Sequence, residues 1–119
     1  MNFNIVIPAR YESSRLPGKP LIKIGGIPMV IRTAMQASKS GAKNVIIATD
    51  DIRIKNIAEK YNFKSLMTDK NHPSGTDRVL EIANHEGWLN NEIIINVQGD
   101  EPLINPELIK LLAKALDKN

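Results

Sequence analysis

The chain has 119 residues, 42% of them hydrophobic and 24% charged, with a net charge of +3 at pH 7. This length predicts one domain with a single core, the composition is too apolar for a disordered chain, and the absence of any Lys/Arg block argues against nucleic-acid binding. Zero cysteines exclude a disulfide framework and a thiolate metal site, and no stretch approaches the roughly 18 apolar residues of a membrane span, so we expect a cytoplasmic protein.

Two strand–helix units are indicated by the apolar patterns of the first half. Residues 3–7, FNIVI, predict a buried strand, and residues 44–49, NVIIAT, predict a second one. A helix is expected between them, from about Pro28 to Ser40, after a turn at two glycines. After the second strand, Asp51 is expected to cap a helix whose inward residues follow the i, i+3, i+4, i+7 spacing, namely Ile54, Ile57, Ala58 and Tyr61.

Two further units follow in the second half. Residues 64–67 predict a short third strand, and Thr76 is the expected N-cap of a helix with three inward residues, Val79, Ile82 and Ala83. Residues 92–97, EIIINV, predict a fourth strand. Pro106 opens a last helix, on which one side is expected to face inward through Leu108, Leu111, Leu112 and Ala115.

The alternation of four strands with four helices predicts an α/β fold with a mostly parallel sheet and helices on both of its faces. Right-handed crossovers are expected, and ligands are expected beyond the carboxyl ends of the strands.

The loop after the first strand is the strongest candidate for chemistry. In "IPARYESSRLPGKP", residues 7–20, the cations Arg10, Arg15 and Lys19 can converge on one polyanion, and Gly18 lets the backbone approach closely. The alternative is a solvated basic loop. Position at the end of a strand favours a triphosphate, although neither a Walker loop nor GxGxxG is present.

A second loop, "HPSGTDR" at residues 72–78, offers small residues and backbone amides before a helix. Ser74 and Gly75 would let a planar base or a sugar come near. Taken alone, this loop is explained more simply by helix capping, with Arg78 pairing on the surface with Glu81 or Asp77.

A third loop, "NVQGDEP" at residues 96–102, places Gln98 and Asp100 just past the fourth strand. A carboxylate there suits Mg²⁺, which takes one or two carboxylates together with substrate phosphates. The alternative is that Asp100 is only a turn residue after a glycine. Asp50, after the second strand, is a minor candidate for a supplementary ligand.

Taken together, "IPARYESSRLPGKPL", "HPSGTDR" and "NVQGDEP" closely resemble, in this order and spacing, the 3-deoxy-manno-octulosonate (Kdo) cytidylyltransferases, which are also called CMP-Kdo synthetases. The resemblance spans residues 7–102 and implies a Rossmann-like nucleotidyltransferase fold. It also implies Mg²⁺-dependent transfer of CMP from CTP to Kdo, with release of pyrophosphate, for lipopolysaccharide synthesis.

The resemblance further implies roles for individual residues. Arg10, Arg15 and Lys19 would hold the triphosphate of CTP, with Lys19 and Arg15 acting in catalysis. The cytidine pocket would be formed in part by Ser74, Gly75 and Arg78. Gln98 would face the nucleotide or the sugar, and Asp100 would be catalytic as the Mg²⁺ ligand.

Members of this family continue well beyond the last residue of this chain. The resemblance therefore implies that residues 1–119 are the amino-terminal, CTP-binding part of a truncated domain. The remainder would supply another metal-binding aspartate, most of the Kdo pocket and the main contacts of a homodimer. Without it, the fourth strand should leave an unpaired apolar edge, which predicts limited solubility or low stability for the isolated chain.

Several alternatives stay open. The acceptor could be a related acid sugar, such as an 8-amino analogue of Kdo or sialic acid. The fragment could bind nucleotide without turnover. Nucleic-acid binding is disfavoured because aromatic residues make up only 4% of the chain and Trp88 stands apart from the cations.

Overall fold

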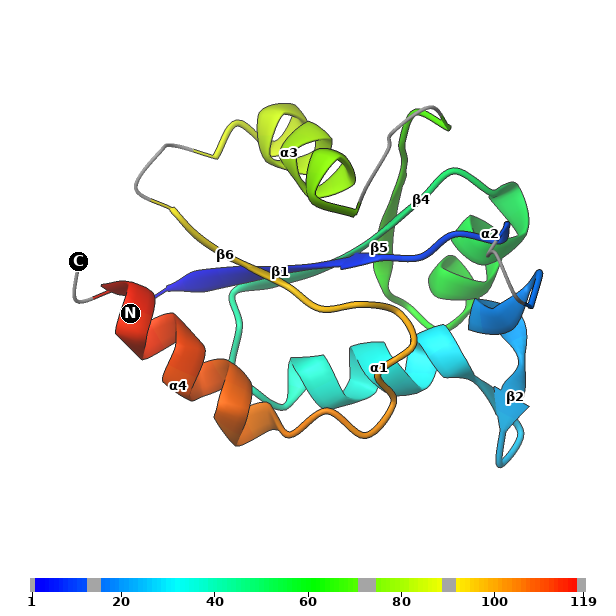
Figure 1. The fold of residues 1–119 in the computed structure, drawn as a ribbon, viewed down its shortest axis with the longest axis horizontal. Helices are drawn as coiled ribbons and strands as arrows, with labels where there is room; N and C mark the ends of the chain where they lie inside the picture. Colours follow the sequence, from blue (N-terminus) through cyan, green and yellow to red (C-terminus); the bar gives the residue numbers. More distant parts are fainter. Residues whose placement is uncertain (1, 13–15, 71–74, 89–91, 118–119) are drawn as a thin grey trace.

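The computed structural model describes residues 2–12, 16–70, 75–88 and 92–117, and Figure 1 shows their arrangement. The described residues contain one parallel sheet of four strands in the order β5-β4-β1-β6. Its strands are β1 (Phe3–Pro8), β4 (Asn44–Thr49), β5 (Lys64–Met67) and β6 (Ile93–Asn96). The register pairs Ile5 of the central strand β1 with Val45 on one side and with Ile95 on the other. The predicted parallel sheet is confirmed.

Helices cover both faces of this sheet, as the alternating pattern predicts (Figure 1). They are α1 (Met29–Ser38), α2 (Ile52–Lys60), α3 (Gly75–Glu86) and α4 (Pro106–Asp117). The loop after β1 adds a short 3₁₀ helix and a small hairpin, which consist of η1 (Lys19–Leu21), β2 (Lys23–Ile24) and β3 (Ile27–Pro28). The hairpin was predicted only as a turn. It is tied to α1 by Arg32, which donates to the carbonyl oxygens of Ile24 at 3.0 Å and Gly25 at 3.1 Å.

The core lies on both faces of β1, which explains why this strand is apolar throughout. Side chains alternate along a strand, so Ile5 and Ile7 join the larger apolar cluster with α1, α2 and α4. Val6 points to the opposite face and packs with Val79 and Ile82 of α3. The position of α3 therefore depends on a smaller apolar contact than the positions of the other helices.

Local signals in the sequence place the start of α2 and the end of α3 correctly. Asp51 caps α2 by accepting a hydrogen bond from the Arg53 amide at 2.8 Å. Gly87 follows the last residue of α3 with a φ of +69°, a conformation that favours glycine. The expected N-cap Thr76 is wrong, because α3 already begins at Gly75 and Thr76 lies in its first turn.

The expected inward face of α4 is also wrong. The buried residues of α4 are Ile109 and Ala113. The residues expected to face inward are exposed instead, namely Leu108, Leu111, Leu112 and Ala115. The physical reason is that α4 packs on β6, the edge strand, so only a narrow stripe of the helix meets the core. The apolar pattern of the sequence does not show which of two adjacent rows of apolar side chains on the helix will be buried against the sheet.

The exposed leucines, together with the edge position of β6 in the sheet of the described residues, predict that the 119-residue chain self-associates. We expect Leu111→Lys to reduce this association in sedimentation velocity at increasing concentration. The free energy of unfolding should change by no more than about 0.5 kcal/mol, because Leu111 is exposed. Ile109→Ala on the buried stripe is the control and should cost about 2 to 5 kcal/mol in urea unfolding. A chain that stays monomeric and melts sharply at high concentration contradicts this prediction.

Candidate functional site

A cavity of about 270 Å³ opens at the carboxyl ends of β1 and β6. From β1 the chain first moves outward on one side, through β4 and β5, and then returns to the other side of β1 as β6. The loops that follow β1 and β6 therefore diverge, and such a reversal in strand order is where ligands bind in open α/β sheets. The cavity is lined by residues 8–10, Lys19 and Pro20, Gly75, and residues 98–100.

Three motifs that are distant in the sequence meet at this cavity. Of the expected site residues, the lining includes Arg10, Lys19, Gly75, Gln98 and Asp100. The expected Arg15 and Ser74 lie outside the described residues. Arg78 does not line the cavity.

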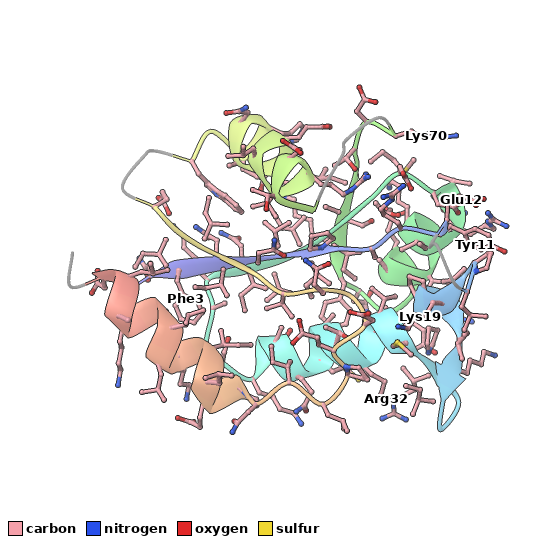
Figure 2. All side chains as sticks on the ribbon, viewed as in Figure 1. Phe3, Tyr11, Glu12, Lys19, Arg32 and Lys70 are labelled. Atoms are coloured by element: carbon pink, nitrogen blue, oxygen red, sulfur yellow. The ribbon has the colours of Figure 1, made fainter. Side chains whose placement is uncertain are left out.

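The loop after β1 is closed by a glycine and an aromatic ring. Gly18 has a φ of +75°, and its amide donates to the Tyr11 carbonyl oxygen at 2.7 Å. A Cβ atom at Gly18 would lie 3.0 Å from the Tyr11 ring, so glycine suits this position both by conformation and by space. Lys19 begins η1 immediately afterwards and is thereby placed at the cavity. Figure 2 labels Tyr11 and Lys19 at the end of the molecule that carries the β2–β3 hairpin.

Arg53 of α2 also contacts this loop, through the ring of Tyr11. Its guanidinium carbon lies 3.4 Å from the centre of the Tyr11 ring, which is a cation–π contact. Arg53 also binds Asp51 through two side-chain hydrogen bonds, at 2.7 and 3.0 Å, and these bonds lower the pKa of the Asp51 carboxyl. Nothing in the sequence indicated this contact, because Tyr11 and Arg53 lie on separate strand–helix units.

The loop after β6 is packed directly on the end of β1. The Gly99 amide donates to the Pro8 carbonyl oxygen at 3.1 Å, and the hydroxyl of the buried Thr33 donates to the Gly99 carbonyl oxygen at 3.1 Å. A Cβ atom at Gly99 would lie 3.1 Å from the Pro8 oxygen and 3.2 Å from Ala9 Cβ. This close approach fixes the backbone of Asp100 at the edge of the cavity, and the sequence alone did not reveal the part played by Thr33.

Lys19 and Asp100 form an ion pair across the cavity. Lys19 Nζ lies 3.2 Å from Asp100 Oδ2, and their side chains are 41% and 48% exposed. Exposed pairs of this kind contribute little to stability, about 0 to 1 kcal/mol, because water screens both charges. The pair can therefore open at small cost, which would leave a cation for an anionic ligand and a carboxylate for a metal ion.

The carboxylate of Asp100 is the donor group that a hard cation would use in this cavity. Among the described residues, no group of three His, Cys, Asp or Glu side chains could hold a metal ion. The minor candidate Asp50 is not among the residues that line the cavity, and its Oδ2 pairs with Arg78 Nη2 at 3.4 Å. One accessible carboxylate fits Mg²⁺ where substrate phosphates complete the coordination.

Arg78 is buried rather than on the surface, so the expected surface pairing is wrong. The side chain is 0% exposed, and its guanidinium donates to Thr68 Oγ1, to the Asp69 carbonyl oxygen at 3.3 Å and to Asp50 Oδ2 at 3.4 Å. These groups follow the ends of β5 and β4. Arg78 therefore connects α3 to the sheet edge near the cavity.

Comparisons with known proteins agree with this arrangement. A family model described as cytidylyltransferase matches residues 4–119. The chain is 46% identical over all 119 residues to the 3-deoxy-manno-octulosonate cytidylyltransferase of Thioalkalivibrio sulfidiphilus (strain HL-EbGR7) and covers 48% of it. It is 53% identical over 116 residues to the enzyme of the same name from Aliivibrio salmonicida (strain LFI1238), where the match covers 98% of the chain and 47% of the relative.

A solved structure shows the same fold. This structure, described as CMP:2-keto-3-deoxy-manno-octonic acid synthetase complexed with CTP, matches all of the chain and 48% of its own chain with a TM-score of 0.91 and 41% identity. The predicted nucleotidyltransferase fold is thus confirmed. The chain spans about half the length of the curated relatives it matches. No helix in the described ranges has the length and apolar character needed to cross a membrane.

The two glycines that line the cavity should respond differently to an added methyl group. Gly99→Ala is expected to lower the free energy of unfolding by about 1 to 3 kcal/mol, because the methyl group meets backbone and core atoms that cannot move aside. At Gly75 the nearest atom would be the Gln98 side-chain nitrogen at 3.3 Å, so Gly75→Ala should cost less than about 1 kcal/mol. Urea unfolding measures both values, and equal costs would show that the loop after β6 is not closely packed.

Proposed function

The chain belongs to the cytidylyltransferase family, and we propose that the protein transfers CMP from CTP to Kdo, giving CMP-Kdo and pyrophosphate. The observation that carries this proposal is the convergence of Arg10, Lys19, Gln98 and Asp100 in one cavity at the reversal of strand order. The curated relatives are named for Kdo, which supports Kdo over an 8-amino analogue or sialic acid as the acceptor.

In this proposal the anomeric hydroxyl oxygen of Kdo attacks the α-phosphorus of CTP. The bond from that phosphorus to the bridging oxygen of pyrophosphate would break, and the proton of the attacking hydroxyl would pass to water. Lys19 and Arg10 would hold the β- and γ-phosphates and offset the charge that develops on the leaving pyrophosphate. Such transfers depend on in-line positioning more than on covalent chemistry by the protein. Gly75 and Gln98 would form the wall beside the nucleoside or the sugar.

The roles of Arg15, Ser74 and Arg78 as CTP ligands stay predictions. We further propose that Asp100 binds Mg²⁺, which when bound would neutralise charge on the phosphate oxygens. Lys19 would then exchange its contact with Asp100 for the phosphates. The Lys19–Asp100 pair supports this proposal because it already holds both groups at the cavity.

The cytoplasmic location, the role in lipopolysaccharide synthesis and the homodimer also stay predictions.

The cation at Lys19 is the first test of the proposal. We expect Lys19→Ala to weaken CTP binding by about 1.5 to 3 kcal/mol, the usual contribution of a charge-assisted hydrogen bond, as measured by isothermal titration calorimetry. Lys23→Ala is the matched control, because Lys23 is an exposed lysine on the nearby β2 outside the cavity lining. CTP affinity that is unchanged in Lys19→Ala would remove this residue from the binding site.

The carboxylate at Asp100 is tested through its dependence on Mg²⁺. Asp100→Asn should impair Mg²⁺-dependent pyrophosphate release from CTP and Kdo far more than it impairs CTP binding without the metal ion. Glu101→Gln, at the next exposed position, should leave both quantities unchanged. Normal release by Asp100→Asn would refute the metal role, and faster release with sialic acid than with Kdo would refute the proposed acceptor.

A further inference from the structure

Arg78 is the largest fully buried side chain among the described residues, and it is charged. It is not among the residues that line the cavity. Its guanidinium pairs with Asp50 Oδ2 at 3.4 Å, and within the described ranges Nε has no hydrogen-bond partner. An incompletely paired buried cation is weak support for stability, because an apolar side chain of similar volume often serves a core as well or better. The burial of Arg78 therefore needs a reason other than stability.

The groups that Arg78 binds lie beyond the ends of two adjacent strands. Thr68 and Asp69 follow β5, and Asp50 follows β4. The Thr68 amide donates to the Thr49 carbonyl oxygen at 2.8 Å, so these two segments are joined to each other. One planar guanidinium thus fixes the beginning of α3 against both segments.

A second side chain of α3 strengthens this connection. Glu81 Oε1 accepts a hydrogen bond from the Asp69 amide at 3.0 Å, one turn further along α3. The apolar contact of α3, through Val79 and Ile82, lies over the middle of the sheet and does not reach the cavity. The polar contacts of Arg78 and Glu81 therefore set the direction of the first turns of α3.

The first turn of α3 includes the wall of the cavity. Gly75 lies three residues before Arg78, and a Cβ atom there would lie 3.3 Å from Gln98 Nε2 and 3.5 Å from Pro8 Cγ. Because this wall is already in close contact with both strand ends, a small shift of α3 changes the space beside Gln98.

We propose that Arg78 is a positioning residue, which holds the first turn of α3 through Thr68, Asp69 and Asp50 and thereby sets the Gly75–Gln98 wall of the nucleotide cavity. The identity of the ligand, CTP, rests on the proposed function. The effect of Arg78 on the position of α3 does not. This inference concerns the position of α3, and the contact of Arg78 with cytidine stays a separate prediction.

The test compares Arg78→Met with Lys64→Met. Lys64 also connects β5 to α3, through an ion pair with Glu86 at 2.5 Å, but at the far end of the helix. Arg78→Met should weaken CTP binding by about tenfold in calorimetry, because a displaced α3 lowers the complementarity of the Gly75–Gln98 wall to the nucleotide. Lys64→Met should leave CTP affinity unchanged. Asp50→Asn, which keeps the shape of the side chain, should give a smaller loss in the same direction, and Arg78→Lys should restore part of the affinity.

Hydrogen exchange gives a readout that needs no nucleotide. Amides of Gly75 to Arg78 and of Asp69 should exchange faster in Arg78→Met, whereas the amides of β1 should not change. Unaltered exchange at these positions, or equal CTP affinity in Arg78→Met and the unsubstituted chain, overturns the positioning role. Loss of CTP affinity in Lys64→Met as large as that in Arg78→Met also overturns it. If the unsubstituted chain does not bind CTP, the proposed function fails, and the exchange experiment alone then decides the role of Arg78.

Discussion

The close contact between the ends of β1 and β6 is the constraint on which the cavity depends. The hydrogen bond from the Gly99 amide to the Pro8 carbonyl oxygen brings the two loops together where a side chain at Gly99 would not fit. Thr33 of α1 holds the other side of Gly99. With this contact in place, Arg10 and Asp100 leave the sheet on opposite sides of one cavity. Without it, the cationic and anionic loops would have no fixed distance between them.

Charge is distributed in this cavity in a way that suits a nucleotide and a metal ion together. Lys19 and Asp100 neutralise each other across the opening, and neither is deeply buried. An exposed pair costs little to separate, so in the proposed function a triphosphate and a divalent cation would replace both partners at once. Hydrogen bonds hold the backbone of the site at Gly99, whereas the two charged side chains are partly exposed. This division allows binding without rearrangement of the sheet.

Most of the fold could be predicted because its signals are local. The buried strand at residues 3–7 and the cap at Asp51 follow from apolar pattern and side-chain chemistry within a few residues. The inward stripe of α4 could not be predicted, because the choice between Ile109 and Leu108 depends on how far the sheet extends beneath the helix. The loop motifs indicated the polar lining of the cavity. The burial of Arg78 and the contact of Arg53 with Tyr11 depend on how separate units pack, which residue spacing does not encode.

A crystal structure of the chain with CTP and Mg²⁺ tests the central claim most directly. The account predicts that the triphosphate lies between Arg10 and Lys19, that the metal ion contacts Asp100, and that the Lys19–Asp100 distance increases from its present 3.2 Å. A triphosphate bound elsewhere, with Arg10 and Lys19 pointing into solvent and the Lys19–Asp100 pair intact, would contradict it.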